Sequence, residues 1–317
     1  MNHEKRIEGG KLNKRPKNSS FIGEIRLNKW VYLMALPGLL FYLIFCYGPM
    51  YGAIIAFKDY SPALGIMGSK WIGFEHFIKF FTGEFFGRTF KNTIIISFYN
   101  IIFGFPAPII LALLLNEINS SKFKKIVQTV TYLPHFVSLV VICGLITTFT
   151  MNDGIINDII AFFGGKRSNL LQRPEMYRPI HIISGIWQEI GWGSIVYLAA
   201  LGGIDSSLYE AARIDGAGRI RQTFAVTLPG IMPTIVVLFI MQIGKIMNVG
   251  FEKVILLYNP STYETADIIS TFVYRKGIEE MNYSFSAAVG LFNSVINLFM
   301  LWGANTLSRK VNETSLW

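Results

Sequence analysis

Residues 207–233 read SLYEAARIDGAGRIRQTFAVTLPGIMP, a polar stretch between two long apolar stretches of the chain. Ser207 stands three residues before Glu210, which is the spacing of a capping box at the start of a helix. Gly216 marks the end of that helix, because helices commonly stop at a residue with a left-handed backbone. The stretch therefore predicts a short polar helix followed by a turn.

A second short helical turn is predicted over Arg219–Phe224, just before the next apolar segment begins. Pro229 and Pro233 open that segment, where a missing amide donor costs little. An ordinary surface loop of helix, turn and helix would explain any one of these residues. It explains the whole string less well.

As a whole, the string resembles the cytoplasmic EAA loop in permease subunits of bacterial type I ABC importers. Within these importers it is most similar to the maltose-permease-like carbohydrate class, in its lipo-oligosaccharide and alginate-oligosaccharide branch. In span number and loop placement the resemblance extends over residues 30–310. It implies that the loop couples the permease to an ATPase through Glu210, Ala211, Ala212, Asp215, Gly216, Ala217, Phe224, Leu228 and Pro229.

Composition independently indicates a membrane protein. Apolar residues make up 52% of the 317 residues and charged residues only 15%, which leaves too little polar surface for a soluble globule. A membrane span needs about 20 mostly apolar residues. Six stretches qualify: Trp30–Phe57, Thr89–Leu115, Ile126–Thr150, Ile180–Gly202, Ala225–Val249 and Ser284–Leu307. The predicted fold is all-α and polytopic, with six transmembrane helices and a cytoplasmic coupling helix.

The distribution of Lys and Arg predicts the orientation of these spans. Basic residues cluster before the first span, between the second and third spans, in the polar loop and after the sixth span. Both termini are therefore expected in the cytoplasm, on the same side as the loop. The predicted domains are a basic cytoplasmic tail (1–29), a transmembrane permease domain (30–310) with its coupling loop (205–233), and a cytoplasmic C-terminal tail (311–317).

The net charge of +9 would suggest nucleic-acid binding in a soluble protein. Here the basic residues before the first span are explained as a positive-inside tail that contacts anionic lipid. No nucleic-acid partner is expected. On the opposite side, 59–88 is rich in aromatic residues and predicts either an interfacial collar or a simple aromatic belt, and 154–163 predicts a short amphipathic helix.

Catalytic motifs are missing from the sequence. It contains no G-x-x-x-x-G-K-[ST] phosphate loop, and its four histidines and two cysteines have no metal-ligand spacing. The chain is therefore not expected to be an enzyme or to bind a metal or cofactor itself. The resemblance implies that ATP and Mg²⁺ bind to separate ATPase subunits.

Polar residues inside the spans are the candidates for a substrate pathway, because a polar group in the bilayer core needs a cavity or a partner. In the fifth span the steps of three, three and four residues place four of them on one helical face. The full set is Gln188, Glu189, Gln242, Lys245, Asn248, Glu252, Asn293 and Asn297. Interhelical hydrogen bonding is the alternative for the amides, and a buried pair with Glu189 or Glu252 is the alternative for Lys245.

The predicted function is that of a membrane-spanning subunit of an ATP-driven importer, located in the bacterial plasma membrane. The cation at Lys245 favours an acidic oligosaccharide as its substrate. The resemblance implies three kinds of partner: a second permease subunit in a heterodimer, two ATPase subunits, and an extracytoplasmic solute-binding protein. The alternative is an ion-coupled secondary transporter with Lys245 and Glu189 as its coupling pair, although the sequence contains no detectable inverted repeat.

Overall fold

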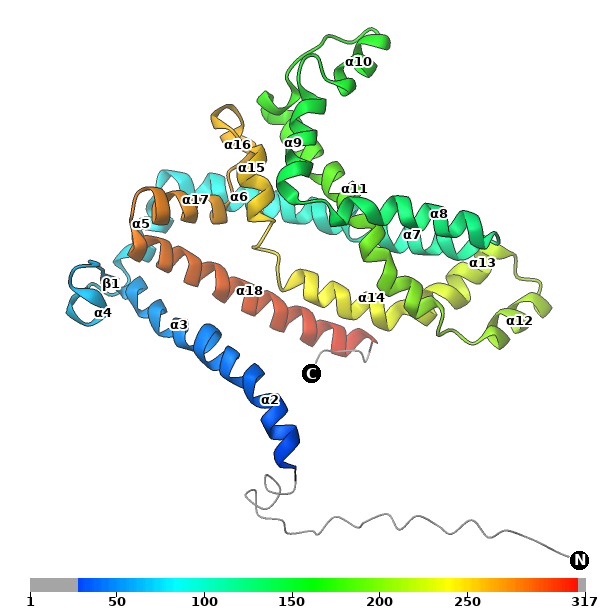
Figure 1. The fold of residues 1–317 in the computed structure, drawn as a ribbon, viewed down its shortest axis with the longest axis horizontal. Helices are drawn as coiled ribbons and strands as arrows, with labels where there is room; N and C mark the ends of the chain where they lie inside the picture. Colours follow the sequence, from blue (N-terminus) through cyan, green and yellow to red (C-terminus); the bar gives the residue numbers. More distant parts are fainter. Residues whose placement is uncertain (1–27, 313–317) are drawn as a thin grey trace, which may run out of the picture. The chain divides into compact units, whose positions relative to one another are not determined.

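The computed structural model describes residues 28–312, and their contacts divide them between two units, 1–53 and 54–317. Helices dominate the described residues of both units (Figure 1). The described strands are β1 (Lys58–Asp59) and β2 (Lys70–Trp71), which form one antiparallel pair. The predicted all-α class is confirmed. Most of the predicted basic tail, 1–27, lies outside the described residues.

The described part of the first unit is a single apolar helical stretch. It comprises α2 (Lys29–Phe41), a π-helical turn (Tyr42–Tyr47) and α3 (Gly48–Met50), and a 3-10 turn (Tyr51–Phe57) carries the chain into the second unit. No side chain of the first three elements is buried within the structure. A surface this apolar is suited to lipid or to another apolar subunit. The stretch Lys29–Phe57 agrees with the first predicted span.

An aromatic cluster follows in the second unit, around the strand pair, α4 (Gly65–Gly68) and α5 (Glu75–Thr82). The ring of Phe57 stacks on Trp71 with centroids 5.7 Å apart and meets Phe74 edge-on at 5.4 Å. These rings therefore contact one another rather than standing separately, as expected for a collar more than for a simple belt.

The next span joins α6 (Glu84–Tyr99), a π-helical turn (Asn100–Gly104) and α7 (Pro106–Glu117) into one helix, Glu84–Glu117. It contains the predicted second span. The irregular turn precedes Pro106, whose ring cannot fit inside a regular helical ladder.

The third predicted span, Ile126–Thr150, is wrong as one helix. The chain forms α8 (Ser121–Tyr132), a 3-10 turn (Leu133–Phe136) and α9 (Leu139–Thr150), followed by α10 (Ile155–Phe162). Pro134 lies in the turn, and Ser138 caps the new helix by accepting a hydrogen bond from the Val141 amide. The apolar segment is instead Leu139–Phe162, and α10 confirms the short helix predicted at 154–163.

The long helix α11 (Pro174–Leu201) lies at the centre of the second unit, in contact with α7 and α8. Gly191 permits the close approach of α8, because a Cβ there would lie only 2.1 Å from the Thr131 carbonyl oxygen. With 28 residues α11 is long enough to cross a bilayer. It is too polar to count among the five apolar membrane-capable helices of the described chain.

The remaining spans end the chain. After the short helix α12 (Ser206–Ile214), α13 (Arg219–Gln222), a π-helical turn (Thr223–Thr227) and α14 (Leu228–Ile243) form one helix, Arg219–Ile243. Then come α15 (Phe251–Leu257), a 3-10 turn (Pro260–Thr262), α16 (Tyr263–Ala266), α17 (Ile269–Tyr274), a π-helical turn (Arg275–Glu279) and α18 (Tyr283–Asn312). α14 runs beside α18 (Figure 1).

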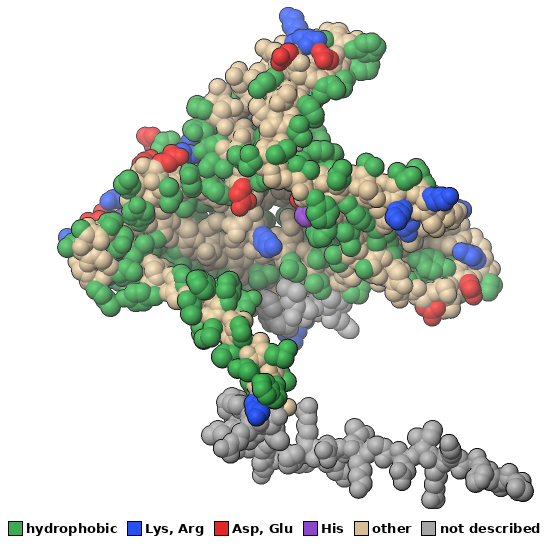
Figure 2. Space-filling view, in the orientation of Figure 1, with side chains coloured by type: hydrophobic (Ala, Val, Ile, Leu, Met, Phe, Trp, Pro, Cys, Tyr) green, Lys and Arg blue, Asp and Glu red, His purple; other side chains and the backbone are tan. Residues whose placement is uncertain are grey.

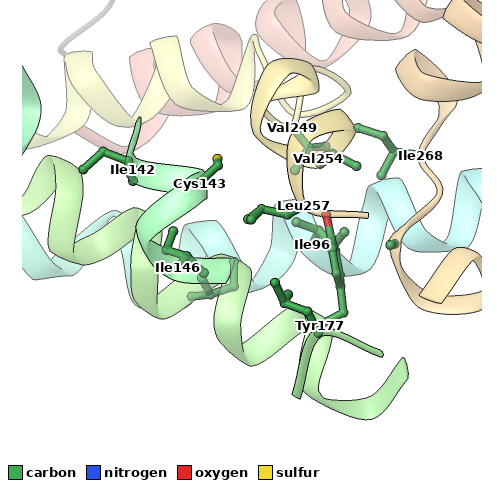
Figure 3. Packing of buried hydrophobic residues seen from close by; sticks show 12 residues of the cluster. Ile96, Ile142, Cys143, Ile146, Tyr177, Val249, Val254, Leu257 and Ile268 are labelled. Carbon is green, nitrogen blue, oxygen red and sulfur yellow. The ribbon is translucent and has the colours of Figure 1, made fainter. Parts of the chain in front are cut away.

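The largest core cluster joins distant parts of the second unit. Figure 3 shows Ile142, Cys143 and Ile146 of α9 near Ile96 of α6 and Tyr177 of α11. Val254 and Leu257 of α15 belong to the same cluster. The core therefore holds α15 against the spans before it.

Coupling loop and central cavity

The short helix α12 is capped at both ends by its own sequence. Its N-cap is Asp205, whose carboxylate accepts a hydrogen bond from the Ser207 amide at 2.9 Å. This bond also holds the pKa of Asp205 below its usual value. The predicted capping box between Ser207 and Glu210 is wrong, because the helix begins at Ser206 and a carboxylate takes the cap.

The C-terminus of α12 confirms the predicted role of Gly216. This residue has φ +75°, and the amides of Gly216 and Ala217 donate to the carbonyls of Arg213 and Ala212 at 3.0 and 2.9 Å. These two bonds form a Schellman motif, which satisfies carbonyls that the end of a helix leaves open.

The loop is tied to the helix that follows it. Tyr209 donates to the Thr227 hydroxyl at 3.1 Å, and the Gln222 side chain donates to the Ala217 carbonyl at 2.6 Å. The predicted helical turn at Arg219–Phe224 is confirmed as α13, which continues through a π-helical turn into α14. The π-helical turn changes the helical hydrogen-bond pattern just before Pro229, which lacks an amide donor.

The outer surface of the loop exposes both charge and apolar area. Ile214 is 87% exposed, Ile220 77% and Phe224 67%. Glu210 is exposed as well, and it makes no ion pair within the described chain. Of the other predicted coupling residues, Ala211, Asp215, Gly216 and Pro229 are exposed, and Ala212, Ala217 and Leu228 are half-buried.

A cavity of about 830 Å³ lies between α7, α11, α14 and the chain that follows α14. In Figure 2 a histidine and a basic side chain lie beside a recess in the face that is drawn. Six of the eight predicted pathway residues line this cavity: Gln188, Glu189, Gln242, Lys245, Asn248 and Glu252.

The fifth-span residues reach the cavity in a way that the sequence did not predict. The predicted span Ala225–Val249 is wrong at its end, because α14 stops at Ile243 and the chain turns irregularly until Gly250, where φ is +70°. Lys245 and Asn248 therefore lie on this turn, and Glu252 lies on α15. Irregular backbone at membrane depth is tolerated where it is enclosed by protein or lines a cavity.

Asn293 and Asn297 do not line the cavity but hold the turn in place. Asn293 donates to the Asn248 side chain at 3.1 Å, and the Asn297 oxygen accepts from the Met247 amide at 3.0 Å. Ser97 of α6 donates to the Ile246 carbonyl. Both asparagines of α18 thus make structural hydrogen bonds, as in the alternative interpretation, but their partners lie on the irregular turn rather than on another helix.

Glu189 is engaged by a histidine rather than by Lys245. Nδ1 of His135 lies 2.9 Å from the Glu189 carboxylate, and the imidazole stacks on Trp192 with centroids 4.4 Å apart and planes 2° apart. Neither Glu189 nor Glu252 lies within ion-pair distance of Lys245 in the described chain. The predicted buried pair is therefore absent from this conformation of the described residues.

Just before α17, a buried carboxylate is bound by two arginines. Asp267, which is fully buried, accepts from Arg275 at 2.6 and 2.8 Å and from Arg88 at 3.2 Å. Burial alone would lower the pKa of Arg275, but its hydrogen bonds to Asp267 and Tyr258 raise that pKa above its usual value. Bidentate pairing of this kind fixes geometry, so the network joins α6 to the turn before α18.

The comparisons with known proteins agree with this architecture. Residues 80–313 match the family described as "Binding-protein-dependent transport system inner membrane component". The chain belongs to this family. The permease is 45% identical over 305 residues, or 96% of its length and 95% of the relative's, to the polygalacturonan/rhamnogalacturonan transport system permease protein YteP of Bacillus subtilis (strain 168). It is 44% identical over 302 residues, 95% of both chains, to Protein LplB of the same organism.

The permease also resembles solved structures. It matches, with a TM-score of 0.87 and 44% identity over 93% of its length and 99% of the other chain, a bacterial alginate ABC transporter crystallised with an alginate pentasaccharide-bound periplasmic protein. The predicted permease of a carbohydrate ABC importer is thus confirmed. The permease is a multi-pass protein of the plasma membrane, in a family of transporters rather than enzymes.

Two cavity-lining residues of the permease were missed as candidates from sequence. Lys253 and His181 both line the cavity and both are buried, at 7% and 4% exposure. Lys253 lies beyond the predicted end of the fifth span, and His181 was considered only for metal binding. Lys245 lies on the turn after α14 and Lys253 on α15, and the turn brings both residues to the cavity.

Proposed function

We propose that this permease forms part of the translocation pathway of an ATP-driven importer for an oligosaccharide, and that the oligosaccharide is acidic. The observation that carries the proposal is the cavity of about 830 Å³, whose lining combines amides with the ammonium of Lys245. Amides hydrogen-bond sugar hydroxyls, and an ammonium group binds a carboxylate. The names of similar proteins, which include polygalacturonan and alginate transporters, support an acidic sugar.

The coupling loop 205–233 is proposed to contact an ATPase subunit through α12. Glu210 and the apolar side chains of Ile214 and Ile220 are exposed there, so both charge and apolar area are available to a partner. ATP and Mg²⁺ would bind to two such ATPase subunits, and the permease itself would bind no cofactor.

The topology proposed for the permease has six spans, with α11 as the fourth. α11 lies against neighbouring helices and lines the cavity along one side, so it needs less apolar surface than a helix in lipid does. Both termini and the coupling loop would then lie in the cytoplasm. The proposed domains are the tail 1–29, the permease domain 30–310 and the tail 311–317.

A second permease subunit is proposed to complete the pathway as a heterodimer, as the resemblance to ABC importer permeases implies. A solute-binding protein would deliver the sugar on the extracytoplasmic side, and lipid would surround the remaining apolar surface. Binding of ATP would favour one conformation of the ATPase pair, and α12 would transmit that preference to the spans.

The test is transport by the complete complex. The permease is tagged, the chains that co-purify with it are identified, and the complex is reconstituted in vesicles together with its binding protein. Uptake of an oligogalacturonide should require ATP on the side of the membrane that carries the ATPase subunits. It should persist when ion gradients are collapsed. Uptake driven by a gradient without ATP would overturn the proposal in favour of a secondary transporter.

A further inference from the structure

Lys253 is a buried cation whose hydrogen-bonding capacity is largely unused. Its side chain lies at the cavity with the residue only 7% exposed. The ammonium donates to the His181 carbonyl at 3.0 Å, and this is its one hydrogen bond to the described chain. An ammonium group carries three donors, so two are left for the cavity.

The nearby carboxylates do not neutralise Lys253. No acidic side chain of residues 28–310 lies within ion-pair distance of its ammonium group. Glu189, on the same cavity, is bound to His135 at 2.9 Å, and Glu252 is exposed next to Lys253 in sequence without pairing to it. A buried charge without a counter-charge is costly, which makes a purely structural lysine a poor solution at this position.

The space in front of the ammonium group is kept open by a glycine. Gly185 of α11 also lines the cavity, and a Cβ at this position would lie 3.3 Å from the Lys253 Nζ. Any side chain there would press on the ammonium group. Lys253 and Gly185 together therefore form a small cationic recess in the cavity wall.

We infer that Lys253 binds a carboxylate of the passing sugar, as a second cationic contact beside Lys245. This assignment rests on the proposed function and adds to it a residue that determines specificity. Two ammonium groups line the same cavity, one on the turn after α14 and one on α15. Both would bind carboxylates of a uronic-acid oligosaccharide, whereas a neutral sugar has no carboxylate for them to bind.

The experiment measures the preference for charge directly. The purified, complete transporter is titrated, without binding protein and up to millimolar concentrations, with a galacturonic acid trisaccharide and with its carboxyl-reduced neutral counterpart. The quantity of interest is the ratio of the two dissociation constants. Lys253→Met should reduce the preference for the acidic sugar by about ten- to hundredfold, and Lys253→Arg should largely preserve it.

Two further variants separate specificity from folding. Lys79→Met removes an exposed lysine that pairs with Glu75 at 2.7 Å, away from the cavity, and should leave the ratio unchanged. Gly185→Ala keeps the lysine but crowds its ammonium group, and should lower the preference several-fold. This variant still tests the inference if Lys253→Met fails to assemble.

The outcomes are distinct. A wild-type protein that binds both sugars without preference overturns the acidic substrate of the proposed function. A wild-type protein with the preference and a Lys253→Met protein with an unchanged ratio overturn the assignment of Lys253 alone. Equal losses for both sugars also overturn it and identify Lys253 as a support for α15. Binding of neither sugar to the wild type would overturn the proposed function itself.

Discussion

Two glycines in the coupling loop offer a matched test of how this loop is held. Gly216 and Gly218 are both exposed, and a Cβ at either would meet no atom within 4 Å. They differ in backbone conformation, because Gly216 has φ +75° and Gly218 has φ −69°. Valine is therefore expected to strain the backbone at Gly216 and to fit at Gly218.

The expected magnitude follows from that difference. A β-branched residue held at positive φ costs about 1 to 3 kcal/mol. A cost near the middle of this range lowers the population of the folded turn, relative to competing conformations, by about thirtyfold. The Schellman hydrogen bonds of Gly216 and Ala217 would be lost with it, and α12 would no longer be presented in one orientation.

ATP-dependent uptake in vesicles is the assay, with membrane abundance measured in parallel. Gly216→Val should reduce uptake at least tenfold while abundance stays near wild type, and Gly216→Asn should retain more activity because Asn tolerates the left-handed region. Gly218→Val should behave like the wild type. Equal uptake by the Gly216→Val and Gly218→Val proteins would refute the idea that the turn conformation carries coupling.

Three other predictions address charge, topology and stability. Glu210→Lys should insert normally but lose ATP-dependent uptake, since it reverses an exposed charge; unchanged uptake would remove Glu210 from the ATPase contact. In a protein without native cysteines, a cysteine at Ser61 or Ser261 should react with an impermeant thiol reagent from outside, whereas one at Ser206 should require a permeant reagent; the reverse pattern would contradict the orientation. Asp267→Asn should destabilise the protein by about 3 to 5 kcal/mol, because it leaves two arginines without their buried counter-charge; a thermal midpoint within about 1 °C of the wild type would disprove this.

The sequence predicts best what is local. The end of α12 at Gly216 could be predicted because one residue type is favoured at positive φ. The start of α12 could not be placed to the residue, since Asp205 and Ser207 are both good caps. Apolar windows located most of the spans in the same way.

What the sequence could not predict depends on contacts between distant segments. The break of the third span at Pro134 looked like a continuous apolar stretch, because proline is tolerated in many membrane helices. The turn after Ile243 is held by Ser97, Asn293 and Asn297 from other helices. The periodicity of one segment does not reveal contacts of this kind with other helices.

The continuous helix Arg219–Ile243 connects the coupling loop to the cavity. It is 25 residues long, about 37 Å at 1.5 Å per residue, with the Tyr209 contact to Thr227 near one end and the cavity turn at the other. A displacement of α12 would be transmitted to the cavity wall through this one helix. The rotation of the residues about the helix axis then matters as much as the length of the helix. A single residue inserted into this helix would rotate everything beyond it by about 100°. Lys245 would then turn away from the cavity, although every local contact of the loop would remain.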